Sequence, residues 1–265
     1  MPPSLKLLSS AQNDTVKQLA RLMQHGRECR RQGVMVLEGI HLSQSCLQAG
    51  WSLEQVFVHP RASLCGEVRE LLQALPDHAR AYELDAGLFS RLSALNSAPE
   101  ILAVCRRPTL LGAHPHASRL LLEDIRDPGN MGTILRSAAA SGLTQVFLSP
   151  GCVDVYSAKV LRAGMGAHFA LDLHENIELL AELQAFSGIK LVTSLEGDRS
   201  LYAQDLTPPV AFVFGNEGAG VSAALHDAAD ARVRIPMPGR AESLNVAMAA
   251  TLCLFERVRQ IEQAG

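Results

Sequence analysis

The sequence predicts an α/β protein made of two successive domains. Short apolar runs suited to buried strands alternate with segments of helical pattern through both halves of the chain. Between residues 108 and 118 the alternation stops, and this stretch contains Gly112, two prolines and two histidines without periodicity. We therefore expect a small α/β domain over residues 1–107, a linker over 108–118 and a second α/β domain over 119–265.

The first half contains helical patterns over 13–31 and 41–49 and strand-like runs at 34–37, 56–58 and 101–105. The predicted helix over 13–31 is rich in basic residues. Lys17 and Arg21 lie four residues apart, as do Arg27 and Arg31, so each pair can share a helix face. Charge alone favours a solvated surface here, with contacts to nucleic-acid phosphates as the alternative.

The second half repeats the alternation more clearly. Strand-like runs lie at 120–122, 146–148, 189–193, 210–214 and 233–235, and the best helical patterns cover 130–141 and 243–262. Strands separated by helices predict a mostly parallel sheet covered on both faces. Ligands of such sheets bind in the loops at the carboxyl ends of the strands.

Composition narrows the class of protein. The chain has 265 residues, is 48% hydrophobic and carries a net charge of −3, which is ordinary for a globular protein. No apolar run is long enough for a membrane span, and the start Met1 to Ser4 lacks the pattern of a secretion signal, so we expect a cytoplasmic protein without membrane contact. The six cysteines are scattered, and His114 with His116 makes a poor ligand pair, so we expect no metal.

Three polar loops follow predicted strands of the second half. The first contains Asn130 and leads into a helix with Arg136, where Asn130 is either a helix N-cap or a functional group. The second, Gly215 to Gly220, lacks the spacing of known phosphate loops. Its acid, Glu217, would repel a phosphate, so this loop suits a neutral or cationic ligand.

The third loop runs from Ile235-Pro236-Met237 to Ser243-Leu244-Asn245 at the start of the last helix. Ser243 has the chemistry of an N-cap. Asn245, one turn into the expected helix, is a mediocre helix former without an obvious packing reason.

Taken in this order, the three loops resemble the signature motifs of the SpoU (TrmH-like) family of RNA ribose methyltransferases in the SPOUT superfamily. Asn130, Gly132 and Arg136 match N-x-G-x-x-x-R, residues 215–220 match G-N-E-G-x-G, and residues 235–237 with 243–246 match I-P-M followed by S-L-N-V. Residues 156–167 resemble a segment near the family's active site, and residues 33–39 resemble its substrate-binding domain. Nearly the whole chain is covered, the first half less specifically.

The resemblance implies a second domain threaded into a trefoil knot and paired as a homodimer, with a small RNA substrate-binding domain before it. It implies S-adenosylmethionine as cofactor and a ribose 2′-hydroxyl of structured RNA, most specifically 23S-type ribosomal RNA, as acceptor. The cofactor would be held near Leu195, Gly197, Gly215, Asn216, Gly218, Ile235, Met237 and Leu244. Lys17, Arg21, Arg27 and Arg31 would contact RNA.

The resemblance also assigns roles at the reacting centre. Arg136 is the family's candidate for activating the hydroxyl, but a guanidinium stays protonated, so we expect it to clamp the neighbouring phosphate and stabilise the developing alkoxide. Asn130, Ser243 and Asn245 would position these groups. Glu217 would fix its loop or contacts of the second subunit.

Four other functions remain open from the sequence. The chain could methylate a base on the same scaffold, act on transfer RNA, serve as a catalytically silent RNA-binding protein of ribosome assembly, or bind a sugar nucleotide or phosphate. Glu217 in the glycine loop argues against the last, and the intact Arg136, Glu217 and Asn245 argue against the silent binder.

Overall fold

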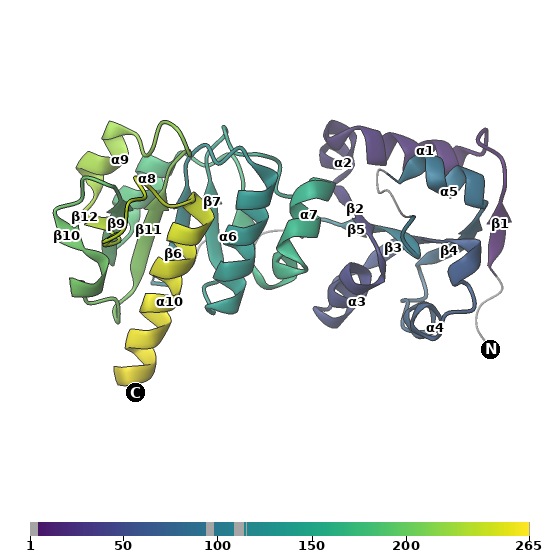
Figure 1. Ribbon diagram of the computed structural model, residues 1–265. Helices are drawn as coiled ribbons and strands as arrows, with labels where there is room; N and C mark the ends of the chain where they lie inside the picture. Colours follow the sequence, from purple (N-terminus) through teal and green to yellow (C-terminus); the bar gives the residue numbers. More distant parts are fainter. Residues whose placement is uncertain (1–4, 94–97, 109–113, 115, 265) are drawn as a thin grey trace. The chain divides into compact units, whose positions relative to one another are not determined.

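The computed structural model describes residues 5–93, 98–108, 114 and 116–264, and the chain divides into two compact units (Figure 1). The first unit comprises residues 1–109 with 156–162, and the second comprises 110–155 with 163–265. Residues 109–113 and 115 of the predicted linker lie outside the described residues. So do Met1 to Ser4, the start of the chain in which no secretion signal was recognised.

The first unit contains a five-stranded sheet in the order β1-β4-β3-β5-β2. Its strands are β1 Lys6–Leu8, β2 Val34–Glu38, β3 Leu53–Val58, β4 Arg80–Leu84 and β5 Ile101–Arg106. Its helices are α1 Asp14–Gln24, α2 Gly26–Gln32, α3 Ile40–Gln48, α4 Gly66–Gln73 and α5 Ala86–Leu92, with the short η1 Pro60–Ala62. Strand β5 is antiparallel to β2 and β3, whereas β4 is parallel to β1 and β3. Figure 1 shows α1, α2 and α5 on one face of this sheet and α3 and α4 on the other.

The single helix predicted over 13–31 is wrong, because two helices occupy this range. His25 has an extended backbone, with φ −130° and ψ 97°, and its N–H closes α1 by donating to the carbonyl of Arg21. The chain then restarts as α2 at Gly26, a residue that weakens a helix interior. The two basic pairs of the predicted helix therefore lie on separate helices.

The second unit contains a seven-stranded sheet in the order β10-β12-β9-β11-β6-β7-β8. Its strands are β6 Arg119–Leu122, β7 Gln145–Leu148, β8 Asp172–His174, β9 Ile189–Thr193, β10 Arg199–Ser200, β11 Val210–Phe214 and β12 Ala231–Arg234. Its helices are α6 Pro128–Ala140, α8 Leu179–Ala185, α9 Ala223–Ala228 and α10 Val246–Ala264, with η2 Ala167–Ala170 and η3 Leu201–Ala203. Helix α7, Ala158–Gly164, has residues in both units. Every pair of neighbouring strands is parallel, which confirms the predicted parallel sheet.

Helices cover both faces of this sheet, because successive strand residues point to opposite sides. On one side, Leu121, Phe147 and Val213 pack with the buried leucines of α8 and α9. On the other side lie α6 and α10, joined by a 2.7 Å hydrogen bond between the hydroxyls of Ser137 and Thr251 (Figure 1). Both faces are thereby closed, and the strand ends stay open for polar loops. No helix in the described ranges combines the length and the apolar character that crossing a bilayer requires.

Candidate active site at the carboxyl ends of the strands

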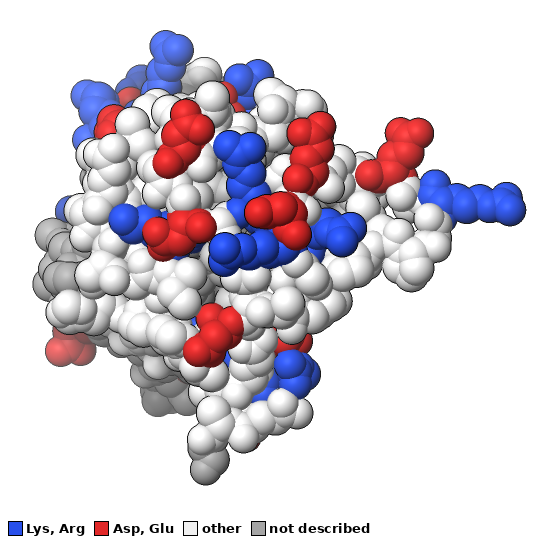
Figure 2. All heavy atoms as spheres, turned by 90° about the vertical axis from the view of Figure 1, so that its left-hand side faces the viewer, with Lys and Arg blue, Asp and Glu red and all other residues white. Residues whose placement is uncertain are grey.

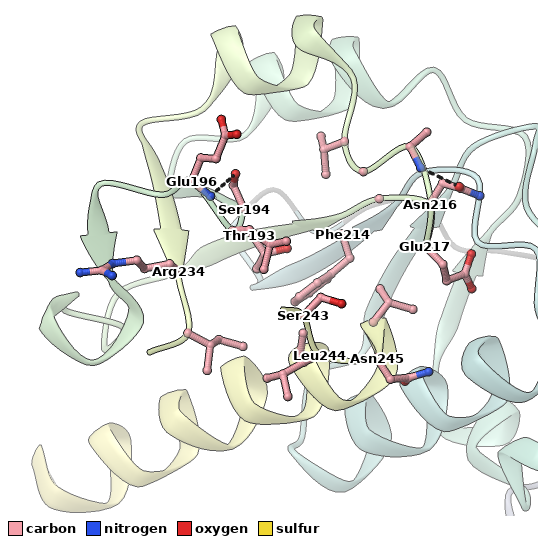
Figure 3. A pocket seen from close by; sticks show the side chains of 18 of the residues that line it. Thr193, Ser194, Glu196, Phe214, Asn216, Glu217, Arg234, Ser243, Leu244 and Asn245 are labelled. Carbon is pink, nitrogen blue, oxygen red and sulfur yellow. Dashed lines mark hydrogen bonds between the residues drawn. The ribbon is translucent and has the colours of Figure 1, made fainter. Parts of the chain in front are cut away.

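A cavity of about 660 Å³ opens where the neighbouring strands β12, β9 and β11 end (Figure 3). Parallel strands place all their carboxyl ends at one edge of the sheet, so the loops that follow them meet there. The cavity is lined by polar, small and apolar residues from three parts of the chain, 193–196, 214–221, and 233–235 with 237 and 243–246, together with His226 and Ala249. Its volume lies within the usual range of small-molecule sites.

The glycine loop after β11 is held by its own asparagine. The Asn216 side-chain oxygen accepts hydrogen bonds from the backbone N–H groups of Gly218 and Ala219 at 2.9 and 3.0 Å. The loop closes where the N–H of Gly220, at φ +72°, donates to the carbonyl of Asn216. A Cβ atom on Gly215 would lie 2.2 Å from the backbone of Gly220, so only glycine fits at position 215.

Three polar side chains from distant parts of the chain form one hydrogen-bonded chain beside this cavity. Asn245 Nδ2 donates to Asn130 Oδ1 at 2.8 Å, and Asn130 Nδ2 donates to Glu217 Oε1 at 2.8 Å. Asn245 and Glu217 come from the loops after β12 and β11, and Asn130 comes from the first turn of α6, which follows β6. The structure thus brings together the side chains that the three sequence motifs single out.

The sequence left Asn130 and Ser243 open as possible N-caps, and neither of them caps its helix. Asp127 caps α6, accepting from the N–H of Asn130, so Asn130 lies inside the first turn with its amide free to reach Glu217. Helix α10 begins at Val246, and Asn245 rather than Ser243 is the residue whose side chain accepts from the first N–H groups. Asn245 is therefore a cap and a network member, not a residue one turn inside the helix.

Arg136 lies on α6, one turn beyond Gly132, and is exposed. Within the described part of the chain, the Arg136 side chain forms no hydrogen bond and no ion pair. One turn earlier on α6, the absence of a side chain at Gly132 allows residues 163–164 to pack closely against the helix. A Cβ atom at position 132 would lie 2.3 Å from Ala163 Cβ and 2.8 Å from the backbone nitrogen of Gly164. An exposed cation without an acid beside it is suited to an external anion.

The residues predicted to hold the cofactor are gathered at the cavity with one exception. Those that line it are Leu195, Gly215, Asn216, Gly218, Ile235, Met237 and Leu244, together with Glu217, Ser243 and Asn245. Gly197 is not among the lining residues. It packs instead against β12, where a Cβ would lie 2.7 Å from the carbonyl carbon of Val233.

Several lining residues were missed from the sequence. Phe214 ends a strand that was predicted, Val233 lies within another, and Thr193, His226 and Ala249 flank or face the motifs without belonging to them. The motif spacing gave no signal for His226, which reaches the cavity from α9. Burial, reinforced by the Arg232 guanidinium, lowers the pKa of His226, so its imidazole is neutral near pH 7.

The charges around the cavity are more acidic than basic. The lining includes Glu196 and Glu217, and Arg234 extends away from its centre (Figure 3). A neutral His226 adds no positive charge. Backbone N–H groups with nearby carboxylates fit a ligand that carries both polar groups and a positive centre, and they disfavour a phosphate.

The basic residues predicted to contact RNA lie on α1 and α2 of the first unit. Lys17 Nζ lies 3.8 Å from Asp14 Oδ1, and Arg31 Nη2 forms an ion pair with Glu28 Oε1 at 2.6 Å. Hydrogen bonds from Arg31 and then Gln32 lower the pKa of Glu28, which keeps that carboxylate ionised. Arg21 and Arg27 form no ion pair with another described residue, although Arg21 is close enough to Glu28 to contribute to lowering its pKa. Both arginines border a surface hollow that Glu28 and Arg31 also line.

Other parts of the surface carry mixed charge. Figure 2 shows basic and acidic side chains interspersed on the end of the second unit that carries β10 and β12. Such a face has no extended positive field to attract a phosphate backbone. Across the described ranges, no three His, Cys, Asp or Glu side chains are grouped as metal ligands.

Comparison with known proteins explains this arrangement of loops. Residues 117–255 match the model of the SpoU rRNA methylase family. The chain belongs to this family. Residues 13–103 of this SpoU methylase also match the MRM3-like substrate binding domain.

Relatives extend over nearly the full chain. The SpoU methylase is 30% identical over 253 residues to the 23S rRNA (guanosine(2553)-2′-O)-methyltransferase RlmP of Bacillus subtilis, covering 95% of this chain and 98% of the relative. The AdoMet-bound rRNA methyltransferase from Sinorhizobium meliloti superposes with a TM-score of 0.86 at 28% identity, over 97% of this chain and 98% of that one. The SpoU methyltransferase AviRb from Streptomyces viridochromogenes, in complex with AdoMet, superposes with a TM-score of 0.83 at 28% identity, over 94% of this chain and 98% of that one.

Proposed function

We propose that this SpoU methylase transfers a methyl group from S-adenosylmethionine to a ribose 2′-hydroxyl of 23S-type ribosomal RNA. The observation that carries the proposal is that the second and third signature loops line one cavity, while Asn130 of the first motif is hydrogen-bonded to both Glu217 and Asn245. The relatives named above act on ribosomal RNA or carry AdoMet, according to their names. These findings support ribose methylation over base methylation and over a silent RNA-binding protein.

The residues at the cavity fit this cofactor. Its adenosyl and amino-acid parts offer many hydrogen-bonding groups, which suit the backbone of residues 215–218, Ile235, Met237 and Leu244, and Leu195 also lines the cavity. Its sulfonium is a cation, which suits a cavity whose lining acids are Glu196 and Glu217. When bound, the cofactor supplies an electrophilic methyl group. Gly197 would act by letting its loop approach β12 closely rather than by contact.

The chain's own residues would orient the ribose and manage its proton. Arg136 would clamp the phosphate next to the target nucleotide and stabilise the negative charge that develops on the 2′-oxygen. A phosphate oxygen or a water would take the proton. Asn130 and Asn245 would hold the geometry through their hydrogen bond, with Ser243 beside them, while Glu217 would fix the glycine loop through Asn130.

The apolar face of α10 supports a homodimer formed through the second unit. Met248, Leu252 and Phe255 are spaced by about one helical turn and are 39–48% exposed, which is unusual for large apolar side chains of a monomer. A partner subunit would cover this stripe. We further propose that the chain around β12 and α10 is threaded as the trefoil knot typical of the family, and that the enzyme acts in the cytoplasm, where ribosomal RNA is found.

Within the first unit, Lys17, Arg21, Arg27 and Arg31 would contact phosphates of the RNA around the target site. Arg21 and Arg27 are best placed for this role, because Lys17 and Arg31 already form ion pairs. The match of residues 13–103 to a substrate-binding domain supports this division of labour between the units.

The proposal is tested by methyl transfer in vitro. Total ribosomal RNA from a strain lacking this protein is incubated with the purified enzyme and S-adenosylmethionine tritiated on the methyl group, with transfer RNA as a parallel substrate. A 2′-O-methyl group blocks alkaline cleavage of the next phosphodiester, so the label should appear in dinucleotides from 23S-type RNA. Label in mononucleotides would instead indicate base methylation. Label in transfer RNA alone, or none with either RNA despite calorimetric binding of S-adenosylhomocysteine, would refute the proposal.

A further inference from the structure

Met165 has a backbone conformation that its side chain disfavours. Its φ is +48°, in the left-handed region. The other non-glycine residues with positive φ in the described ranges are Asp124 and Asn176, whose short polar side chains tolerate this region. A methionine has no such compensation, so its conformation is strained.

Nothing in the turn itself calls for a methionine. Met165 lies between Gly164 and Gly166, and Gly166 also has positive φ, at +89°. A glycine at position 165 would adopt the turn without strain. The Met165 side chain is 63% exposed, so it is not retained for burial in the core of this chain. Strain held at an exposed residue is typical of functional sites, where a contact with another molecule uses the side chain.

The position of Met165 relates it to the reacting centre. The preceding residues, Ala163 and Gly164, pack directly on Gly132 of α6. Arg136 follows Gly132 by four residues, so it lies on the same helix face, roughly 6 Å further along. The segment then continues as η2, which also packs on α6. Met165 therefore lies in a segment of the second unit that packs against the helix carrying Arg136.

We propose that Met165 packs against the base of the target nucleotide and so positions its ribose for methyl transfer. This inference rests on the function proposed above. An exposed cation and an exposed apolar side chain on two segments that pack together match the two ends of a nucleotide: Arg136 suits the phosphate, and the polarisable thioether of Met165 suits the flat face of a base. A face contact of this kind is tolerant of sequence, so Met165 would position the base rather than read its identity.

The test uses three variants: Met165→Gly, Met165→Ala and Met165→Leu. Met165→Gly removes the side chain and relieves the backbone strain, so the fold is retained. Met165→Leu keeps an apolar side chain of similar volume. Steady-state methyl transfer is measured with ribosomal RNA from the strain lacking this protein, alongside calorimetry with S-adenosylhomocysteine, thermal unfolding and gel filtration.

We expect Met165→Gly to raise the KM for RNA about tenfold, as suits one partly buried side chain, with a smaller change in kcat. Met165→Ala should behave alike, and Met165→Leu should stay within about threefold of the original enzyme. Affinity for S-adenosylhomocysteine and the oligomeric state should not change, and the Tm should not fall.

Two results would overturn the inference while leaving ribose methylation intact. One is full activity of Met165→Gly with RNA on which the original enzyme is active. The other is a loss of activity that accompanies weaker cofactor binding or a change in oligomeric state, which would place Met165 against the cofactor or a second subunit. If the original enzyme itself transfers no methyl group to ribose, the proposed function fails first, and the two failures are thereby told apart.

Discussion

The loop edge of the second unit and the basic surface of α1 and α2 are organised in opposite ways. At the loop edge, hydrogen bonds join residues far apart in the chain: 115 positions separate Asn245 from Asn130, and 87 separate Asn130 from Glu217. On the basic surface the ion pairs are local, since Lys17 and Arg31 each pair with an acid three residues away.

This difference separates two kinds of binding. Long-range hydrogen bonds fix side chains in a geometry set by the whole fold, which methyl transfer in line requires. Local pairs on exposed helices leave long side chains free to adapt, which suits a phosphate backbone bound mainly by charge. Substitutions at the loop edge should therefore damage chemistry or cofactor binding sharply, whereas those on the helices should change affinity gradually.

The largest effect is expected at Arg136, which lies on α6, the helix that leads away from the loop edge, and outside the hydrogen-bonded network. Arg136→Ala should lower kcat for methyl transfer by about 10²- to 10³-fold, because a preorganised cation near the reacting oxygen is lost. Binding of S-adenosylhomocysteine, measured by calorimetry, should be nearly unchanged. The Tm should also hold, since the side chain is exposed. Full activity with tritiated cofactor would remove Arg136 from the mechanism.

A smaller effect is expected from the glycine loop. Gly215→Ala places a Cβ 2.2 Å from the backbone of Gly220, so the loop must shift, and affinity for S-adenosylhomocysteine should fall by at least about tenfold. Gly239→Ala is the matched control, because nothing lies within 4 Å of its added Cβ. Equal affinities of the two variants would show that the loop's shape does not determine cofactor binding.

The smallest effect is expected on the basic helices. The double variant Arg21→Gln/Arg27→Gln should weaken RNA binding a few-fold and reduce the slope of log affinity against log salt by about 2. Lys17→Gln/Arg31→Gln, the control with the same change in charge, should do less, because its cations are partly neutralised. Filter binding at several salt concentrations measures the affinity and the salt slope of each variant and of the original protein. Identical slopes for all forms would make this surface irrelevant to RNA.

Strand periodicity and loop chemistry were readable from the sequence, because both depend on neighbouring residues. Apolar runs such as 210–214 identified the strands of a parallel sheet, and the order of three polar loops identified the family. The same local reasoning placed most of the cofactor-binding candidates at one edge, since parallel strands end together.

Other features were decided only by the tertiary structure. The sequence does not show that His25 breaks the first helix, that Asp127 rather than Asn130 caps α6, or that Met165 is held at positive φ. Each depends on backbone angles or on partners more distant than a few residues. Propensities average over such contexts, whereas the fold selects one conformation by the contacts it closes.

The sequence by itself therefore determined the alternation of strands and helices, the family, and the chemical types gathered at the strand ends. The tertiary structure decided which of those groups touch: Asn130 reaches Glu217 and Asn245, Gly197 packs on β12 away from the cavity, and Arg136 has no partner among the described residues. The physical reason is that residue type fixes what a side chain can bind, but only the packed backbone fixes where it points.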